Sequence, residues 1–303
     1  MPLDFVSRGP ARQNPRHRKA IERIAHERML AFLADFQASH LRAMGQGRGL
    51  VDIRERDPLL AGAFSAKTLS EHRLLLSFKS AAGHLYQDLA VCIGQLSYEV
   101  HETLPETRLT EDQLALVAAA LRTCDAQPPE PILVAEGAPT LVLDPGQVNR
   151  YGGWVSALRP VDGDFIDREA GTHHLIELKS SGKLSNKAAR SEKEALIMHG
   201  YGLRNHYLAT RQPDPAVHIF LGVAQGTEVS SAVRQYFEPH EVLDAPAFWG
   251  FVSQLADGHA LVTRAIDAHS GEIERMRSRL LDEVYPLPGP GLGLSDEDDE
   301  EEG

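Results

Sequence analysis

The chain has 303 residues, of which 42% are hydrophobic and 24% charged, and this composition predicts a globular protein with ample length for a core. It contains no apolar run long enough to cross a bilayer, and its arginine- and proline-rich first 19 residues lack the apolar stretch of a secretory signal, so neither a membrane partner nor export is expected. The two cysteines are too few and too far apart for a thiolate metal site or a disulfide scaffold, which favours a reducing cytoplasmic location.

The net charge of −12 does not exclude DNA as a partner, because the acids are concentrated at one end. Residues 296–302 are seven consecutive acids, and without them the charge is −5. Residues 1–30 hold seven basic against three acidic residues, and residues 179–206 hold six against two, so each stretch carries a local charge of +4.

The first half of the chain is predicted to be mainly helical. Residues 1–15 resemble a flexible arm, and an apolar stripe then predicts a helix over 16–43 that buries Ile21, Ile24, Ala25, Leu30, Leu33 and Phe36. A second stripe predicts a helix from about Ser70 to Val100, and a third helical stretch covers 111–124.

The second half alternates strands and helices. Short strands are expected at 132–135 and 140–143, followed by an antiparallel hairpin of Trp154–Asp167 and Thr172–Ser180 with its turn near 169–171. The remaining expected elements are a helix over 187–198 capped by Ser185 or Asn186, a buried parallel strand over 217–224, helices over 245–256 and 260–284, and a disordered acidic tail.

The order helix, strand, strand, strand, helix, strand across 70–224 predicts an α/β (α+β) fold, in which a mixed central sheet is flanked by helices and extended by further N- and C-terminal helices. The corresponding division of the chain is a basic arm and N-terminal helix at 1–65, a core at 66–230, a C-terminal helical region at 231–286 and the acidic tail at 287–303.

The hairpin carries the chemically informative residues. Pairing Asp167 with Thr172 would place Asp162 opposite Glu177 and Asp164 opposite Leu175. Asp162, Asp164, Glu177 and Lys179 would then share one face, where two carboxylates could hold a hard divalent cation and the lysine could stabilise an anion or help to deprotonate water. Asp164 is the preferred metal ligand because Phe165-Ile166 follows it into the strand, and Asp162 is the alternative.

A Glu-X-Lys triplet alone is usually a solvated surface pair. Here the preceding acid, the following Ser-Ser-Gly and the basic helix beyond favour a site, and the segment resembles the PD-(D/E)XK nuclease superfamily, with Asp164 as the first acid and Glu177-Leu178-Lys179 as the E-X-K element. The resemblance implies that Asp164 and Glu177 bind Mg²⁺ together with the Leu178 carbonyl, and that Lys179 orients or activates the attacking water. The first helix of these nucleases often supplies another acid, whereas this chain has Gln87 with Asp88 beside it, which puts a second metal site in doubt.

The run 177–196 further resembles type II restriction endonucleases of the TdeIII-like kind, as do 83–90 and 248–252 more loosely. This resemblance implies Mg²⁺-dependent cleavage of double-stranded DNA at a specific short sequence by a homodimer, alongside a cognate DNA methyltransferase that acts on the same site without direct contact. The last helix, with Ile266, Ile273, Met276, Leu280 and Leu281, is one expected dimer contact.

Basic and polar residues that follow the E-X-K strand are expected to contact the DNA backbone, namely Lys183, Asn186, Lys187 and Arg190. For Arg190 an i,i+4 ion pair with Glu194 is an equal alternative. Two other functions remain open at this stage: a repair or junction nuclease directed by DNA structure, and a DNA-binding protein without hydrolytic activity.

Overall fold

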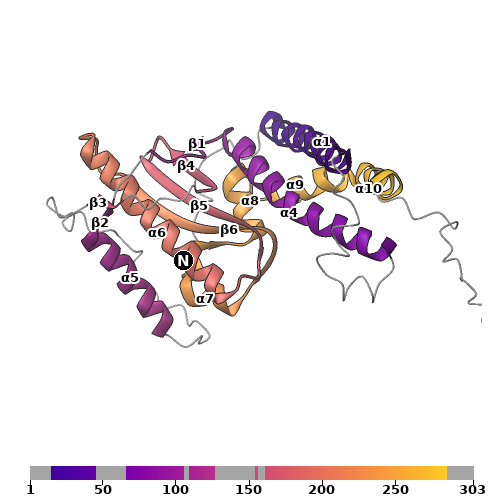
Figure 1. Ribbon diagram of the computed structural model, residues 1–303. Helices are drawn as coiled ribbons and strands as arrows, with labels where there is room; N and C mark the ends of the chain where they lie inside the picture. Colours follow the sequence, from indigo (N-terminus) through magenta and orange to yellow (C-terminus); the bar gives the residue numbers. More distant parts are fainter. Residues whose placement is uncertain (1–14, 46–65, 106–108, 127–153, 156–160, 285–303) are drawn as a thin grey trace, which may run out of the picture. The chain divides into compact units, whose positions relative to one another are not determined.

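The computed structural model describes residues 15–45, 66–105, 109–126, 154–155 and 161–284 (Figure 1). It divides into two compact units, Met1–Arg28 with Gly83–Ile266 and Met29–Ala82 with Asp267–Gly303. The boundaries fall inside two long helices, α1 (Pro15–Gly45) and α4 (Ala66–Gly94), so each helix contributes to both units. The domains predicted from the sequence are consecutive segments, whereas each of these units combines separate stretches of the chain. The predicted domains are not tested by this division and stay a prediction.

The first unit is built around a mixed five-stranded sheet in the order β1-β4-β5-β6-β7. Its strands are β1 (Glu99–His101), β4 (Gly163–Asp167), β5 (Thr172–Gly182), β6 (Ala216–Val229) and β7 (Val242–Leu243). The β1-β4 and β4-β5 pairs are antiparallel, whereas β5-β6 and β6-β7 are parallel. Two further short strands, β2 (Leu109–Thr110) and β3 (Trp154–Val155), pair separately. The predicted α+β class with a mixed sheet is therefore confirmed.

The hairpin between β4 and β5 has the predicted register, in which Asp167 pairs with Thr172 and Asp164 with Leu175. Its turn is fixed by side-chain chemistry: Oδ1 of Asp167 accepts hydrogen bonds from the N–H groups of Glu169 and Ala170, each at 3.1 Å. Gly171 then takes φ +64°, a conformation that favours glycine.

Helix α6 (Asn186–Ala209) connects β5 to the parallel strand β6 and covers one face of the sheet (Figure 1). Ser185 caps it, with its hydroxyl accepting the N–H of Ala188 at 3.2 Å, so one of the two predicted caps is confirmed. Helices α5 (Glu111–Ala126) and α7 (Ser231–Tyr236) pack beside α6. The core on this face contains Val117, Leu121, Leu175, Ala189, Leu196, Leu203, Leu221 and Val233.

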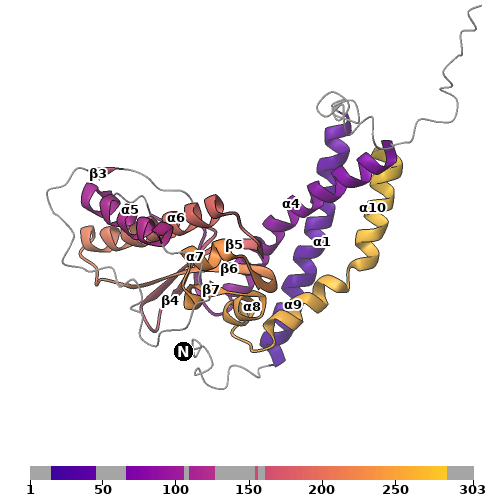
Figure 2. The ribbon, with the colours of Figure 1, turned by 90° about the horizontal axis from the view of Figure 1, so that it is seen from below.

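The opposite face of the sheet is covered by α8 (Ala245–Ser253), with the η4 turn (Pro239–Glu241) before it and α9 (Gly258–Asp267) after it (Figure 2). The indole N–H of Trp249 donates to the Ala224 carbonyl at 3.0 Å. Gly222 allows Phe248 to approach β6, because an added Cβ would lie 2.8 Å from that ring. The end of α4 reaches the same face, where Gly94 contacts Phe165 of β4.

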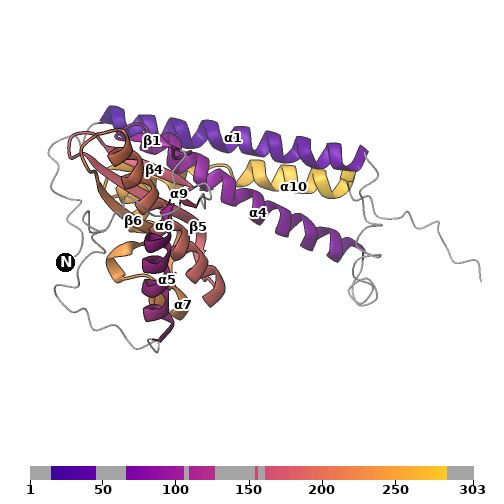
Figure 3. The same cartoon turned by 60° about the vertical axis from the view of Figure 1, so that its left-hand side comes forward.

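The second unit consists of the adjoining parts of α1 and α4 together with α10 (Ser270–Val284), which run side by side (Figure 3). Phe78 of α4 packs edge-on against Phe32 and Phe36 of α1, with ring centroids 5.4 and 5.2 Å apart. Met276 and Leu280, predicted as dimer contacts, are buried within the chain itself.

Several boundaries differ from the prediction. Helix α4 ends at Gly94, whose carbonyl accepts the N–H groups of Ser97 and Tyr98, so Glu99–His101 forms β1 rather than the end of a helix. A three-residue strand is too short to show a period of two. The expected helix 260–284 is interrupted between α9 and α10, and Leu30 is exposed while Met29 is buried. The strands expected at 132–135 and 140–143 and the acidic tail lie outside the described residues.

Within the described part of the chain, no helix has both the length and the apolar character needed to span a membrane. Both cysteine thiols, Cys92 and Cys124, are free, which agrees with the absence of a predicted disulfide scaffold.

Candidate functional site

Charged side chains converge at the beginning of β4 and the middle of β5. Asp162 directly precedes β4, and its Oδ2 accepts the backbone N–H of Leu178 at 2.8 Å. Glu177 and Lys179 lie two residues apart on β5 and therefore on one face, where Nζ of Lys179 donates to Oε1 of Glu177 at 2.7 Å. The structure thus brings together the predicted Glu177 and Lys179 with Asp162, the alternative first acid.

A fourth charged group, Glu192 of α6, joins this cluster, which we call the Lys179 cluster: Asp162, Glu177, Lys179 and Glu192. Oε1 of Glu192 lies 3.0 Å from Nζ of Lys179. Sequence reasoning did not single out this residue. A signal existed, because Ala189 and Leu196 are buried on the side of α6 that faces the sheet, and position 192 is three residues after the first of them.

Burial and mutual repulsion determine the electrostatics of the cluster. Burial, followed by the charge of Asp162, raises the pKa of Glu177 to about 7. Burial likewise raises the pKa of Asp162, although the Leu178 N–H and Lys179 oppose the shift. Burial lowers the pKa of Lys179, but its hydrogen bonds to Glu177 and Glu192 outweigh this and leave it raised. Three carboxylates therefore surround one ammonium, and the Glu177 carboxyl, with its pKa raised to about 7, is the one that holds a proton as neutral pH is approached.

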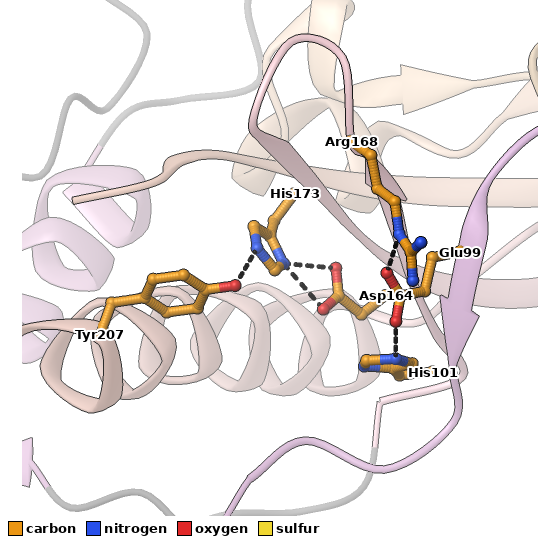
Figure 4. A network of polar contacts seen from close by, with 6 residues as sticks. All are labelled: Glu99, His101, Asp164, Arg168, His173 and Tyr207. Atoms are coloured by element: carbon orange, nitrogen blue, oxygen red, sulfur yellow. Dashed lines mark hydrogen bonds and ion pairs between the residues drawn. The ribbon is translucent and has the colours of Figure 1, made fainter. Parts of the chain in front are cut away.

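Asp164 has a different set of partners, although it lies on the same face of the sheet (Figure 4). Its oxygens are 2.9 and 3.1 Å from Nδ1 of His173, and Nε2 of His173 is 2.9 Å from the Tyr207 hydroxyl. Asp164 is 1% exposed and His173 3% exposed. The structure therefore pairs the sequence-preferred acid with His173 instead of bringing it to Glu177 and Lys179.

The hydrogen-bond order in this second network, Asp164–His173–Tyr207, follows from which groups can donate. An ionised carboxylate only accepts, so Nδ1 of His173 donates to Asp164. When the ring is neutral, Nε2 accepts the proton of the Tyr207 hydroxyl, and when the ring is protonated, Nε2 donates to the hydroxyl oxygen. Both carboxylate oxygens of Asp164 therefore contact His173, whereas a metal-binding aspartate needs an oxygen free for the ion.

An exposed ion pair lies at the sheet edge beside Asp164 (Figure 4). Nε of Arg168 is 2.5 Å from Oε2 of Glu99, and Nε2 of His101 is 3.0 Å from its Oε1. The hydrogen bond from Arg168 is the main reason that the pKa of Glu99 is lowered to about 2. The Arg168 contact links the short edge strand β1 to the hairpin, whereas the His101 contact lies within β1.

The residues predicted to contact DNA lie at the end of β5 and the start of α6. Lys183, Asn186 and Lys187 are exposed, and Lys183 is 3.5 Å from Glu228. Arg190 instead pairs with Asp125 at 3.3 Å and with Glu194 at 3.6 Å, the second being the alternative that the sequence allowed. Lys183, Asn186 and Lys187 are therefore exposed enough to contact a phosphate.

The oxygen donors of the Lys179 cluster could supply some, but not all, of the ligands of a hard divalent cation. Among the described residues there is no group of three or more histidine, cysteine, aspartate or glutamate side chains arranged to hold a metal ion. Asp162 and Glu177 offer two carboxylates that repel each other, and the Leu178 carbonyl points to the same side of β5 as the N–H bound by Asp162. Mg²⁺ commonly takes one or two carboxylates and completes its shell with water or phosphate oxygens.

The amide of Gln87, on α4, lies 3.4 Å from the Asp162 carbonyl, so the helix that could have supplied a further acid supplies a neutral group instead. Neither the models of known protein families nor the sequences of curated proteins gave a match to this chain. The functional assignment therefore depends on the geometry of the Lys179 cluster.

Proposed function

We propose that this chain is a Mg²⁺-dependent endonuclease of the PD-(D/E)XK kind that cleaves double-stranded DNA. The observation that carries the proposal is the convergence of Asp162, Glu177 and Lys179 at one end of the β4-β5 hairpin. Support also comes from the sheet, in which α4 precedes β1, the strands β1, β4 and β5 are antiparallel neighbours, and α6 leads from β5 to the parallel strand β6, although β2, α5 and β3 intervene in the chain between β1 and β4.

In this proposal Asp162 takes the place that the sequence assigned to Asp164. Asp162 and Glu177 would hold Mg²⁺ with the Leu178 carbonyl, and the ion would lower the pKa of a bound water and offset the charge that develops on the phosphate. To serve as a ligand, Glu177 would lose its proton to solvent. Lys179, whose ammonium lies 2.7 Å from Glu177, orients the attacking water or stabilises the developing anion.

The more specific form of the proposal is a type II restriction endonuclease. It derives from the resemblance of residues 177–196 to such enzymes, and it adds a recognition sequence, a homodimer and a cognate methyltransferase that protects the same site. Lys183, Asn186 and Lys187 would contact the phosphate backbone from the exposed start of α6.

The test is incubation of the purified chain with unmethylated phage DNA and Mg²⁺, read on a gel, with Lys179→Ala and Glu177→Ala alongside. Arg211→Ala is the matched control, because Arg211 is an exposed basic residue in the turn after α6. Discrete bands from the wild type and the control, and none from the two cluster variants, are the expected result.

The other outcomes separate the alternatives. A smear of fragments would indicate a nuclease without sequence preference, and cleavage confined to branched DNA would indicate a structure-directed enzyme. Loss of cleavage in Glu177→Ala with DNA binding retained distinguishes an enzyme from a binding protein. Absence of cleavage on all substrates, with Mg²⁺ or Mn²⁺ at low salt, would overturn the proposal.

A further inference from the structure

The Lys179 ammonium has two carboxylate partners from different elements of the fold. Glu177 lies two residues before it on β5, at 2.7 Å, and Glu192 comes from α6, at 3.0 Å. All three side chains are largely buried, with 13% of Glu177, 23% of Glu192 and 26% of Lys179 exposed. A single pair would satisfy the lysine, so the presence of the second acid needs a reason.

Glu192 comes at an electrostatic cost. It places a third negative charge beside Asp162 and Glu177, which already repel each other. Like charges held close together in a half-buried site oppose folding. The cost is offset if Glu192 has a role that Glu177 cannot perform.

Metal binding supplies such a role. A carboxylate that turns its oxygens to a divalent cation is a weaker partner for an ammonium, and the cation itself repels Lys179. We propose that Glu192 is a positioning residue that holds the Lys179 ammonium in place when the Glu177 carboxylate serves the metal ion. This inference rests on the proposed function and assigns Glu192 no direct contact with metal or DNA.

The surroundings of Glu192 suit a fixed anchor. The Ser185 cap secures the start of α6, and the next residue, Lys193, is buried in an ion pair with Glu241 at 2.5 Å. Ala189, which is fully buried, precedes Glu192 by three residues on the same side of the helix. A carboxylate on a helix held at these points keeps its position while the metal-facing groups rearrange.

The experiment compares Glu192→Gln with Glu194→Gln in the full chain. Glutamine keeps the length and an accepting oxygen but removes the charge. Glu194 lies two residues further along α6 and pairs with Arg190 instead. We expect Glu192→Gln to lower kcat by about 10- to 100-fold, as for other residues that orient a functional group. The KM for DNA and the Mg²⁺ affinity measured by calorimetry should not change, and Glu194→Gln should behave like the wild type.

Glu192→Asp provides a second variant, because it restores the charge with a shorter reach and should recover part of kcat. Thermal unfolding of each variant detects a simple loss of stability. An unchanged kcat in Glu192→Gln would overturn the inference, as would a fall in Mg²⁺ affinity that accounts for the whole loss of rate, since Glu192 would then be a ligand. A wild-type chain that neither binds Mg²⁺ nor cleaves DNA would overturn the proposed function and this inference together, whereas the first two outcomes leave the function standing.

Discussion

Asp162 and Asp164 lie two residues apart, on one face of the sheet, yet their carboxylates have opposite surroundings. Asp164 is buried and hydrogen-bonded to a histidine whose other nitrogen meets Tyr207. Asp162 lies beside Glu177, where burial raises the pKa values of both acids. The Asp164 carboxylate is hydrogen-bonded to its histidine partner, whereas the Asp162 and Glu177 carboxylates repel each other.

The difference shows how two acids at the start of one strand can take separate roles, one structural and one chemical. A satisfied buried carboxylate contributes stability, because leaving His173 unpaired would be costly. Two buried carboxylates that repel each other, such as Asp162 and Glu177, oppose folding but are available to a cation. Making the same substitution at Asp162 and at Asp164, and comparing the effects on cleavage and on stability, tests this division directly.

The largest expected effect is on cleavage. Asp162→Asn should reduce DNA cleavage on the order of 1,000-fold, because it removes a charged metal ligand worth several kcal/mol. Asp164→Asn keeps the shape of the side chain and should retain cleavage within roughly tenfold. Single-turnover cleavage rates at saturating Mg²⁺ measure both. The reverse ranking, with Asp164→Asn inactive and Asp162→Asn active, would restore the sequence-based choice of Asp164.

The second effect is on stability and runs in the opposite order. Asp164→Ala leaves His173 buried without its partner and should lower the free energy of unfolding by about 3 kcal/mol. Asp162→Ala relieves repulsion at Glu177 and should change stability by less than about 1 kcal/mol without metal. Urea unfolding in the presence of a chelator, followed by the fluorescence of buried Trp249, makes the comparison. Equal losses in the two variants would show that the cluster around Asp162 is also structural.

The third prediction concerns pH and Glu177. Its pKa is raised from 4.5 to about 7 in the folded chain, so the folded state binds the proton more tightly than the unfolded state. The associated stability is therefore present below pH 4.5 and is lost as the pH rises through 7, by about 3 kcal/mol in total. Metal-free wild type should lose this amount relative to Glu177→Gln over that range. If the difference in unfolding free energy between wild type and Glu177→Gln does not vary with pH, the pKa of Glu177 is not raised in the folded chain.

The sequence predicted the turn of the hairpin, the register Asp167–Thr172 and a parallel strand within β6, because each depends on local chemistry or periodicity. It left Ser185 and Asn186 open as the cap, and it began the first hairpin strand at Trp154, whereas β4 begins at Gly163 and Trp154 pairs with Thr110 in the other sheet. The sequence alone could not show whether Asp162 or Asp164 lies beside Glu177 and Lys179. Both acids lie on the same face, and what distinguishes Asp164 is its contact with His173, whose other nitrogen meets Tyr207 at the far end of α6. Glu192 was missed for the same reason, since its contact depends on how α6 lies across β5.

The smallest expected effect isolates the Tyr207 contact. Tyr207→Phe removes only the hydroxyl that is hydrogen-bonded to Nε2 of His173, which should lower stability by about 1 kcal/mol. DNA cleavage should not change, because the Lys179 cluster keeps its contacts. If Tyr207 acts through His173, the loss should disappear when Tyr207→Phe is introduced into Asp164→Ala/His173→Leu, a background that lacks the acceptor nitrogen. An equal loss in both backgrounds would mean that the hydroxyl of Tyr207 stabilises the fold through a contact other than the one to His173.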